Sequence, residues 1–379
     1  MGKSKSKNKK NKSIKKSSSN INNNDNHSIA YFRINENKDL SVGQYMLQIK
    51  NNDIILAPYT FNVNKTLYKT INDVHYDKIT PSTDLTNSSI LIYRYGGIGD
   101  LLNTLFVVEA LKNKFKNIQI GYICSPSYFS LFNYFTDIVS GVLGVFSSYQ
   151  TIMDKQYFID LTDLAEENQL ATSCSLPFLF GYQFGLTDNE ISTAISRLIA
   201  KISSKTNCPE RNGIGIQLST NAPVRNYNLE HFSKLINMIK EKYPHEKVLL
   251  LSGSQNSISR DYVISNCNYS IDVLKTTDLS KIIFSIARLK MIIGPDSSML
   301  HIAGITNTPM IGLYGPFPSK LRISNYNNAI GIDGKSDCSP CFRHHPTQWC
   351  KYNGNECIAL NSIPPSTILD VVDRIMDIY

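Results

Sequence analysis

The feature that most constrains the fold is a strand, a glycine turn and a helix that follow one another at residues 89–111. Residues 89–94 are mostly apolar, which is typical of a strand buried on both faces of a parallel sheet. Residues 95–99 form a glycine-rich turn, and from Asp100 onward apolar residues recur at helical spacing. A second apolar run follows at 118–123. This order predicts a β-α-β unit and therefore an α/β fold.

The same alternation starts again near Gly213. Two successive α/β halves predict two facing Rossmann-like domains with a cleft between them, which we place at residues 89–208 and 209–332. Residues 361–379 are predicted to end the chain with a closing amphipathic helix. In the second half, strands are predicted at 214–218, 247–251, 291–293 and 310–313, and helices at 229–243, at 279–289 and from 297.

The N-terminal part has a different composition. Residues 29–88 contain short β-rich runs with Asn-rich breaks, which predict a small β-rich appendage. Residues 1–28 hold eight Lys and one Asp, so the rest of the chain carries only +1 of the net charge of +8. A nearly neutral globular part does not favour a nucleic-acid-binding core. The basic tail is predicted to be disordered.

Two further functions of the tail remain open. It could contact an anionic surface electrostatically, and its first residues fit the N-myristoylation pattern. The chain has no uninterrupted run of about 18 apolar residues and no apolar segment of the signal-peptide type near its start. We therefore expect neither a transmembrane segment nor a secretory signal. The predicted location is the cytoplasm, with a peripheral membrane contact through the tail left open.

The first glycine loop is a candidate anion site. Free amides at a helix N-terminus attract anions, and Gly97 and Gly99 let a ligand approach the backbone. The third glycine of a dinucleotide fingerprint is absent, and no P-loop Lys follows. Asp100 would repel phosphate at this place. It is either a helix cap or a general base that deprotonates an acceptor hydroxyl.

A second candidate anion site lies at the strand-to-helix junction around Asp296. Asp296 and Ser297 fall at the helix cap, and His301 follows one turn later. Arg225, in the loop after an earlier strand, has the charge and planar geometry to bind a diphosphate. The structural alternatives are a capped helix with a core His and a solvated surface Arg.

Four of the eight cysteines crowd into residues 338–357, within a segment that we delimit as 333–360. One close C-x2-C pair, in a chain with no export signal, favours a tetrahedral structural metal site over a disulfide scaffold. His344 or His345 could replace one thiolate. The alternative is a set of unligated or disulfide-bonded surface cysteines. The predicted ligands are Cys338, Cys341, Cys350 and Cys357.

Three motifs in order resemble family 9 glycosyltransferases, the heptosyltransferase-like enzymes. They are GDLLNTL at 99–105, IQLS at 216–219 with RNY at 225–227, and GPDSSMLHIAG at 294–304 with TPMIGLYGP at 308–316. The resemblance spans residues 89–320. It implies a GT-B fold of two facing Rossmann-like domains, with the donor bound by the C-terminal half and the acceptor facing the N-terminal half.

The resemblance also implies the chemistry. Asp100 corresponds to the catalytic carboxylate of an inverting transfer from a nucleotide-sugar to a hydroxyl of a glycan or protein. An ADP-linked, heptose-like donor is favoured, and no catalytic metal is expected. Ser298 stands where the family usually has Gly, and Arg225 stands where it has Lys. The donor-binding positions carried over are Arg225, Thr277, Asp296, Ser297, Ser298 and His301.

Similar cysteine clusters occur at this place in autotransporter-type heptosyltransferases, where the resemblance implies an iron-holding finger. The predicted metal is therefore zinc or iron. Two other classes of function remain open. One is a non-catalytic nucleotide- or glycan-binding module on the same fold, which would bind ADP without turnover. The other is a zinc-containing nucleic-acid binder, which would retain DNA or RNA after deletion of residues 1–28.

Overall fold

The computed structural model describes residues 29–34, 37–42, 45–49, 54–58, 68–71, 79–94, 96–144, 155–162, 164–208, 210–251, 257–274, 276, 278–343, 350–352 and 356–378. The basic tail at 1–28 lies outside the described residues.

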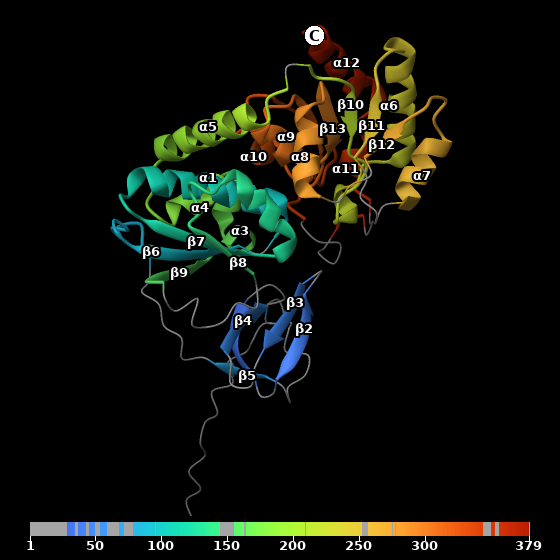
Figure 1. The fold of residues 1–379 in the computed structure, drawn as a ribbon. Helices are drawn as coiled ribbons and strands as arrows, with labels where there is room; N and C mark the ends of the chain where they lie inside the picture. The colour runs from blue at the N-terminus through green and yellow to red at the C-terminus, as the bar shows by residue number, and fades with distance from the viewer. Residues whose placement is uncertain are drawn as a thin grey trace, which may run out of the picture.

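Five short strands lie in the described part of the N-terminal region, which the sequence predicts to be β-rich. Three of them make an antiparallel sheet in the order β4-β1-β5, and the other two form an antiparallel hairpin. In Figure 1 these strands (blue) lie apart from the two parallel sheets. Their bounds are β1 Ile29–Ile34, β2 Lys38–Val42, β3 Tyr45–Ile49, β4 Ile54–Pro58 and β5 Tyr68–Ile71.

The first α/β half contains a four-stranded parallel sheet in the order β8-β7-β6-β9. The direction of strand addition reverses between β6 and β9, and ligands bind at such a switch point in α/β folds. The strands are β6 Ser89–Tyr93, β7 Gln119–Cys124, β8 Gly141–Gly144 and β9 Tyr157–Asp160. The helices are α1 Ile98–Lys114, η2 Pro126–Tyr134, α3 Leu164–Glu167, η3 Gln169–Thr172, α4 Leu176–Tyr182 and α5 Asp188–Lys205.

Helix α1 forms where the sequence predicts it, because its charges and its apolar residues agree with that position. Asp100 lies in its first turn, and Lys112 and Lys114 lie in its last turn, which complements the helix dipole. Ten of its residues, 101–108 together with Ala110 and Leu111, are buried. The helix is therefore covered nearly all round, and it holds the loop before it in a fixed place.

The second half contains a six-stranded parallel sheet in the order β12-β11-β10-β13-β14-β15. This is the 3-2-1-4-5-6 order of a doubly wound sheet, with its switch point between β10 and β13. The strands are β10 Ile214–Ile216, β11 Val248–Leu250, β12 Asp272–Val273, β13 Met291–Pro295, β14 Met310–Tyr314 and β15 Ala329–Asp333. The helices are η4 Pro223–Arg225, α6 Leu229–Lys242, α7 Ser257–Ser265, α8 Leu279–Ala287, α9 Ser298–Ile305, α10 Ser319–Ile323, α11 Ile358–Asn361 and α12 Pro365–Met376.

Among the residues that the structure describes, two apolar cores stabilise the molecule. One lies between the C-terminal sheet and helices α6 and α12, and it includes Phe232 and Val372. The other core runs without interruption from the N-terminal sheet through α1 and α5 to α8 and α9. Figure 1 shows α8 and α9 on the side of the C-terminal sheet that faces α1 and α5. The two halves therefore share buried apolar side chains.

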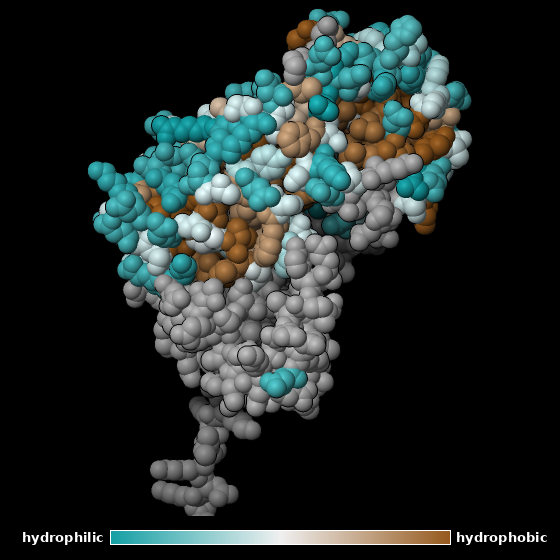
Figure 2. Space-filling model, in the orientation of Figure 1, coloured by the Kyte–Doolittle hydropathy of each residue, from teal (hydrophilic) through white to brown (hydrophobic). Residues whose placement is uncertain are grey.

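Polar residues cover most of the outer surface of α5, as the teal colour in Figure 2 shows. Within the described ranges, no helix has the length and apolar character needed to span a bilayer.

Candidate functional site

A cavity of about 510 Å³ opens between the two halves, where the parallel strands of both sheets end. From the N-terminal half it is lined by the glycine loop and Asp100. From the C-terminal half it is lined by the loops after β10 and β13 and by Arg322 of α10. The candidate site residues among its lining are Gly97, Gly99, Asp100, Arg225, Asp296, Ser297, Ser298 and His301.

Asp100 is held in one orientation by two contacts. Its Oδ1 accepts a hydrogen bond from Nη2 of Arg94 at 3.0 Å, and its Oδ2 accepts one from the Gly97 amide at 3.0 Å. The second contact makes Asp100 the N3 member of a capping arrangement, so the capping interpretation is confirmed. Carboxylate oxygens have further lone pairs, and the side chain is 27% exposed toward the cleft. Capping therefore leaves Asp100 able to accept another proton or hydrogen bond.

The surroundings of Asp100 keep its carboxyl ionised. Desolvation raises the pKa of this carboxyl, but Arg94, the Gly97 amide and Arg322 outweigh it, so the pKa lies below its ordinary value. Arg94 is buried and also donates to the carbonyl of Thr162, which follows β9. It therefore bridges the switch point between β6 and β9 and fixes the carboxylate there.

The glycine that this loop requires is Gly96. Its φ of +154° lies in a region that side chains rarely adopt, and a Cβ there would lie 2.5 Å from Oδ2 of Asp100. Gly97 has a φ of −81°, and the nearest atom to an added Cβ would be 4.0 Å away. Close approach of the chain to Asp100 therefore depends on Gly96.

The C-terminal side of the cleft is built around a buried carboxylate between two arginines. Oδ2 of Asp296 lies 3.3 Å from Nη1 of Arg225 and 3.4 Å from Nε of Arg322. Burial raises the pKa of Asp296, but Arg322, Arg225 and His301 outweigh it and lower the pKa overall. One carboxylate cannot neutralise two guanidinium groups, so this wall of the cleft carries excess positive charge.

His301 is buried one turn into α9. Its Nδ1 lies 3.0 Å from the hydroxyl of Tyr326. Desolvation lowers the pKa of His301, and Arg322 and Arg225 oppose the increase caused by Asp296 and Asp100, so the net shift is downward. The ring is therefore neutral at pH 7. A Cβ placed on Gly99 would lie 2.6 Å from His301 Cδ2, so α1 and α9 meet closely at this point.

Two buried side-chain oxygen atoms in the lining of the cleft have no hydrogen-bond partner among the described residues. Ser297 is the N-cap, yet its hydroxyl makes no capping bond, and its Oγ is buried without a hydrogen bond. Oε1 of Gln217 is also buried without a partner, although Nε2 of the same side chain donates to Ser219 O at 2.5 Å. Buried polar groups are normally paired, so these atoms are suited to bind a ligand.

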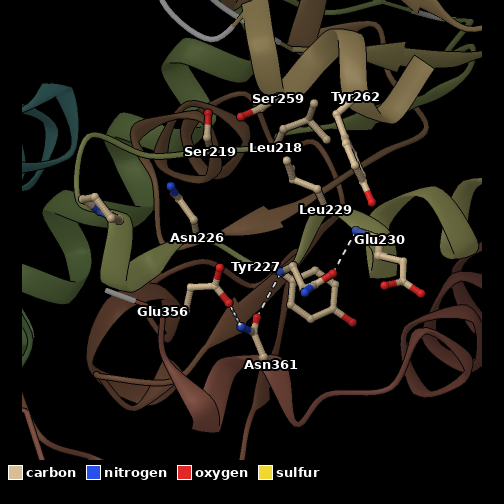
Figure 3. Close-up of a pocket in the computed structure, with 12 residues that line it drawn as sticks. Leu218, Ser219, Asn226, Tyr227, Leu229, Glu230, Ser259, Tyr262, Glu356 and Asn361 are labelled. Carbon is tan, nitrogen blue, oxygen red and sulfur yellow. Dashed lines mark hydrogen bonds between the residues drawn. The ribbon is translucent and has the colours of Figure 1, made fainter. Parts of the chain in front are cut away.

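A second cavity, of about 380 Å³, lies beyond the 219–226 segment and is drawn in Figure 3. There Asn361 Oδ1 accepts from the Asn228 amide at 3.0 Å, and Asn361 Nδ2 donates to Glu356 at 3.4 Å. Glu230 also lines this cavity, and none of the described residues that line it is a Lys, Arg or His. Two carboxylates in this lining, with no cation among its described residues, disfavour a diphosphate, so the first cleft is the candidate donor site.

None of the four clustered cysteines is among the described residues that line either cavity. Glu356, which precedes Cys357, lines the second cavity. None of these four described cysteines forms a disulfide. Burial raises the pKa of Cys357, the amides of Leu360 and Ala359 oppose the rise, and Cys341 and Cys338 add to it. No group of three or more His, Cys, Asp or Glu side chains that could hold a metal occurs in the described part of the chain.

Sequence reasoning missed three residues of the site. Arg94 was assigned only to a strand, and Arg322 and Tyr326 follow the last motif. A basic residue at the end of a strand beside a glycine loop could have indicated Arg94, whereas no local pattern marks Arg322 or Tyr326. Thr277, His344 and His345 lie outside the described residues.

The family model for glycosyltransferase family 9 (heptosyltransferase) matches residues 164–350. No curated protein matches the chain by sequence. Similar solved structures include a family 9 glycosyltransferase from Veillonella parvula, which is 14% identical with a TM-score of 0.60 and covers 78% of this chain and 99% of its own.

Two proteins of Escherichia coli are also similar. Heptosyltransferase WaaC, solved with ADP, is 14% identical with a TM-score of 0.53, covering 76% of this chain and 99% of its own. The iron-containing dodecameric glycosyltransferase TibC is 12% identical with a TM-score of 0.54, covering 92% of this chain and 96% of its own. The resemblance inferred from the three motifs is thereby confirmed: the chain has the GT-B fold, carries the family 9 glycosyltransferase signature over residues 164–350, and is a glycosyltransferase.

Proposed function

We propose that the protein transfers a heptose-like sugar from an ADP-linked donor to a hydroxyl group of a glycan or protein, with inversion at the anomeric carbon. The observation that carries the proposal is the single cleft lined by Asp100 from one half and by Arg225, Asp296 and His301 from the other. The nucleotide and sugar are proposed by analogy, because WaaC was solved with ADP and TibC with ADP-D-β-D-heptose.

In this proposal the diphosphate lies against the C-terminal wall. Arg225 and Arg322 together carry one more charge than Asp296 neutralises, and the N-terminal end of α9 lines the same cleft. Helix N-termini and guanidinium groups both favour phosphate oxygens. Ser297 Oγ and Gln217 Oε1 supply a donor and an acceptor for further donor contacts.

Asp100 then acts on the acceptor. The acceptor oxygen attacks the anomeric carbon, its proton passes to the Asp100 carboxylate, and the bond to the diphosphate breaks with its electron pair on the leaving phosphate. The lowered pKa keeps Asp100 in the unprotonated form that a base needs. The two guanidinium groups stabilise the charge that develops on the phosphate, a role that preorganised cations fill well.

The testing experiment combines binding and turnover for two variants. Asp100→Asn keeps the shape and one acceptor oxygen, which can retain the bond from the Gly97 amide while the contact with Arg94 is lost. Because the amide cannot take a proton, transfer from ADP-heptose should fall about 10²–10⁴-fold while ADP affinity changes little. Asp261→Asn, at an exposed ion pair on α7, is the matched control and should behave as wild type. Full transfer by Asp100→Asn would overturn the base assignment.

The same experiment separates the classes of function. Binding of ADP without transfer to any acceptor would favour a non-catalytic nucleotide-binding module. A selective response to UDP, GDP or CDP would retain the transferase proposal and change the nucleotide.

The cysteine-rich segment is proposed to hold a structural zinc or iron ion through Cys338, Cys341, Cys350 and Cys357. Thiolate sulfurs suit both metals, and TibC contains iron. Metal analysis of the purified protein should give about one ion per chain. Cys357→Ala should lose that ion, whereas Cys267→Ala, which changes a thiol outside the cluster, should keep it. If the wild-type protein contains no metal and added zinc or iron does not change its stability, the site is refuted.

For the basic tail we propose contact with an anionic surface and a cytoplasmic location for the protein. Binding to vesicles that contain phosphatidylserine should require residues 1–28 and should weaken with salt. Equal binding by the protein that lacks residues 1–28 would contradict this role.

A further inference from the structure

The segment that carries the clustered cysteines is fastened to the loop that follows β14. Ser339 Oγ donates to the Gly315 carbonyl at 2.6 Å. The amides of Cys341 and Phe342 both donate to the Pro316 carbonyl, at 3.1 and 2.8 Å. On the other side, a Cβ on Gly315 would lie 2.7 Å from Cys357 Sγ. Residues from both ends of the cysteine cluster therefore enclose Gly315 and Pro316.

The same segment places one aromatic ring against the next part of this loop. The rings of Phe342 and Phe317 meet edge to face, with centroids 5.9 Å apart and an interplanar angle of 84°. Phe342 has a φ of +55°, which is costly for a bulky side chain. The hydrogen bond from the Phe342 amide to the Pro316 carbonyl holds the residue in that conformation. The backbone of the cysteine-rich segment therefore fixes the position of the Phe342 ring.

Phe317 in turn packs against the guanidinium group of Arg322, which lines the cleft. The guanidinium carbon of Arg322 lies 3.9 Å from the centroid of the Phe317 ring, and Arg322 Nε lies 3.4 Å from Asp296 Oδ2. Phe317 is buried, and the Arg322 side chain is only 14% exposed. Packing on one face and an ion pair at one edge leave the guanidinium with few alternative positions. Phe317 therefore helps to hold the charged group of Arg322 at the cleft.

We propose that the cysteine-rich segment positions Arg322 in the donor cleft through Phe342 and Phe317. Phe342 and Phe317 are positioning residues, and Arg322 is the group that meets the anion. A disturbance of the segment is transmitted to the cleft along these contacts, although no cysteine is among the described residues that line the cleft. The proposal rests on the proposed function only for the identity of the anion, a nucleoside diphosphate.

A double-mutant cycle on the full-length protein tests this connection, with ADP affinity measured by calorimetry. Arg322→Gln should weaken ADP binding about tenfold or more, because a charge-assisted contact is lost. Phe342→Leu removes the aromatic edge contact and should weaken ADP binding about two- to tenfold. In the Arg322→Gln background, Phe342→Leu should have no further effect. Arg322→Lys should recover little, because an ammonium group does not stack as a guanidinium does.

The matched control is Phe284→Leu on α8. Phe284 also makes an aromatic pair, with Tyr134 at 6.5 Å between centroids, but it lies outside the lining of the cleft. It should leave ADP affinity unchanged. If Phe342→Leu does not fold, Phe342→Gly replaces it, because glycine adopts a φ of +55° without strain.

An equal loss of affinity from Phe342→Leu with and without Arg322 would overturn the connection, as would no loss at all. A second readout needs no ligand. The Nε–H NMR signal of Arg322, assigned by its absence in Arg322→Gln, should shift in Phe342→Leu and not in Phe284→Leu. If wild-type protein binds no ADP, the proposed donor is wrong, and this signal alone decides the connection: a shift supports it, and an unchanged signal overturns it.

Discussion

Gly99 and His301, 202 positions apart in the chain, touch across the junction of the two halves: the histidine ring occupies the space that a Cβ on Gly99 would need. Gly99 lies in the first turn of α1, and His301 lies in α9. The glycine of the loop motif therefore makes room for a residue of the other half as well as for a ligand.

Gly99→Ala should destabilise the protein. The added carbon would lie 2.6 Å from His301 Cδ2, and the ring cannot easily retreat because Tyr326 holds its Nδ1. Overpacking costs about 1–3 kcal/mol, of which better helix propensity recovers up to about 1. Chemical denaturation should show the loss, and ADP binding should weaken with it. Gly97→Ala, with open space at its Cβ, should be within about 0.5 kcal/mol of wild type.

Asp296→Asn should cost about 3 kcal/mol of unfolding free energy. The substitution leaves Arg225 and Arg322 beside a neutral amide, and breaking a largely buried ion pair from one side is strongly unfavourable. Asp261→Asn, at the exposed pair with Arg260, should change stability by less than about 1 kcal/mol. Equal effects of the two substitutions would show that Asp296 is not electrostatically important.

Stability should fall with acid in two separate pH ranges. The pKa of His301 is lowered in the fold, so its contribution is complete above the ordinary value of about 6.5 and is lost as the pH falls below it. The lowered pKa values of Asp100 and Asp296 give a second loss that begins near pH 4 and continues downward. Denaturation at a series of pH values should show both losses. His301→Asn should remove the first and keep most of the second, because Arg322 and Arg225 still lower the pKa of Asp296.

Tyr326→Phe should separate two roles of Tyr326: its hydroxyl positions His301, and its ring fills space in the core. The ring would still lie across Gly304 and near Phe106, but His301 Nδ1 would lose its partner at 3.0 Å. A stability loss of about 1 kcal/mol is expected, together with a changed ¹⁵N shift of His301 and slower transfer. Tyr227→Phe, which loses a bond to Ile363 O at 2.5 Å, is the matched control and should reduce stability alone.

The sequence predicts what local patterns encode. Helices α1, α6, α8 and α12 and strands β6, β10 and β13 follow from apolar periodicity, with ends that agree within a few residues. The gathering of Asp100, Arg225, Asp296 and His301 in one cleft follows from the rule that ligands bind at the carboxyl ends of parallel strands.

The partners of these residues could not be predicted, because they depend on packing between distant segments. Arg322 reaches Asp296 only because the turn after β14 places α10 beside the cleft, and Tyr326 reaches His301 only through the gap at Gly304. Strand β15 was also missed, because Ala329–Asp333 is a short stretch at the sheet edge and the alternation of Ile330 and Ile332 spans only three residues.

The apolar core that runs through α1, α5, α8 and α9 has a mechanical consequence. Domains joined by small polar interfaces swing apart readily, whereas a large apolar interface ties their motions together. Wide separation of the halves would expose the side chains around Phe106 and Leu300 to water. Substrates should therefore enter and leave by rearrangement of loops at the rim, and a calorimetric scan should record a single melting event in place of one for each half.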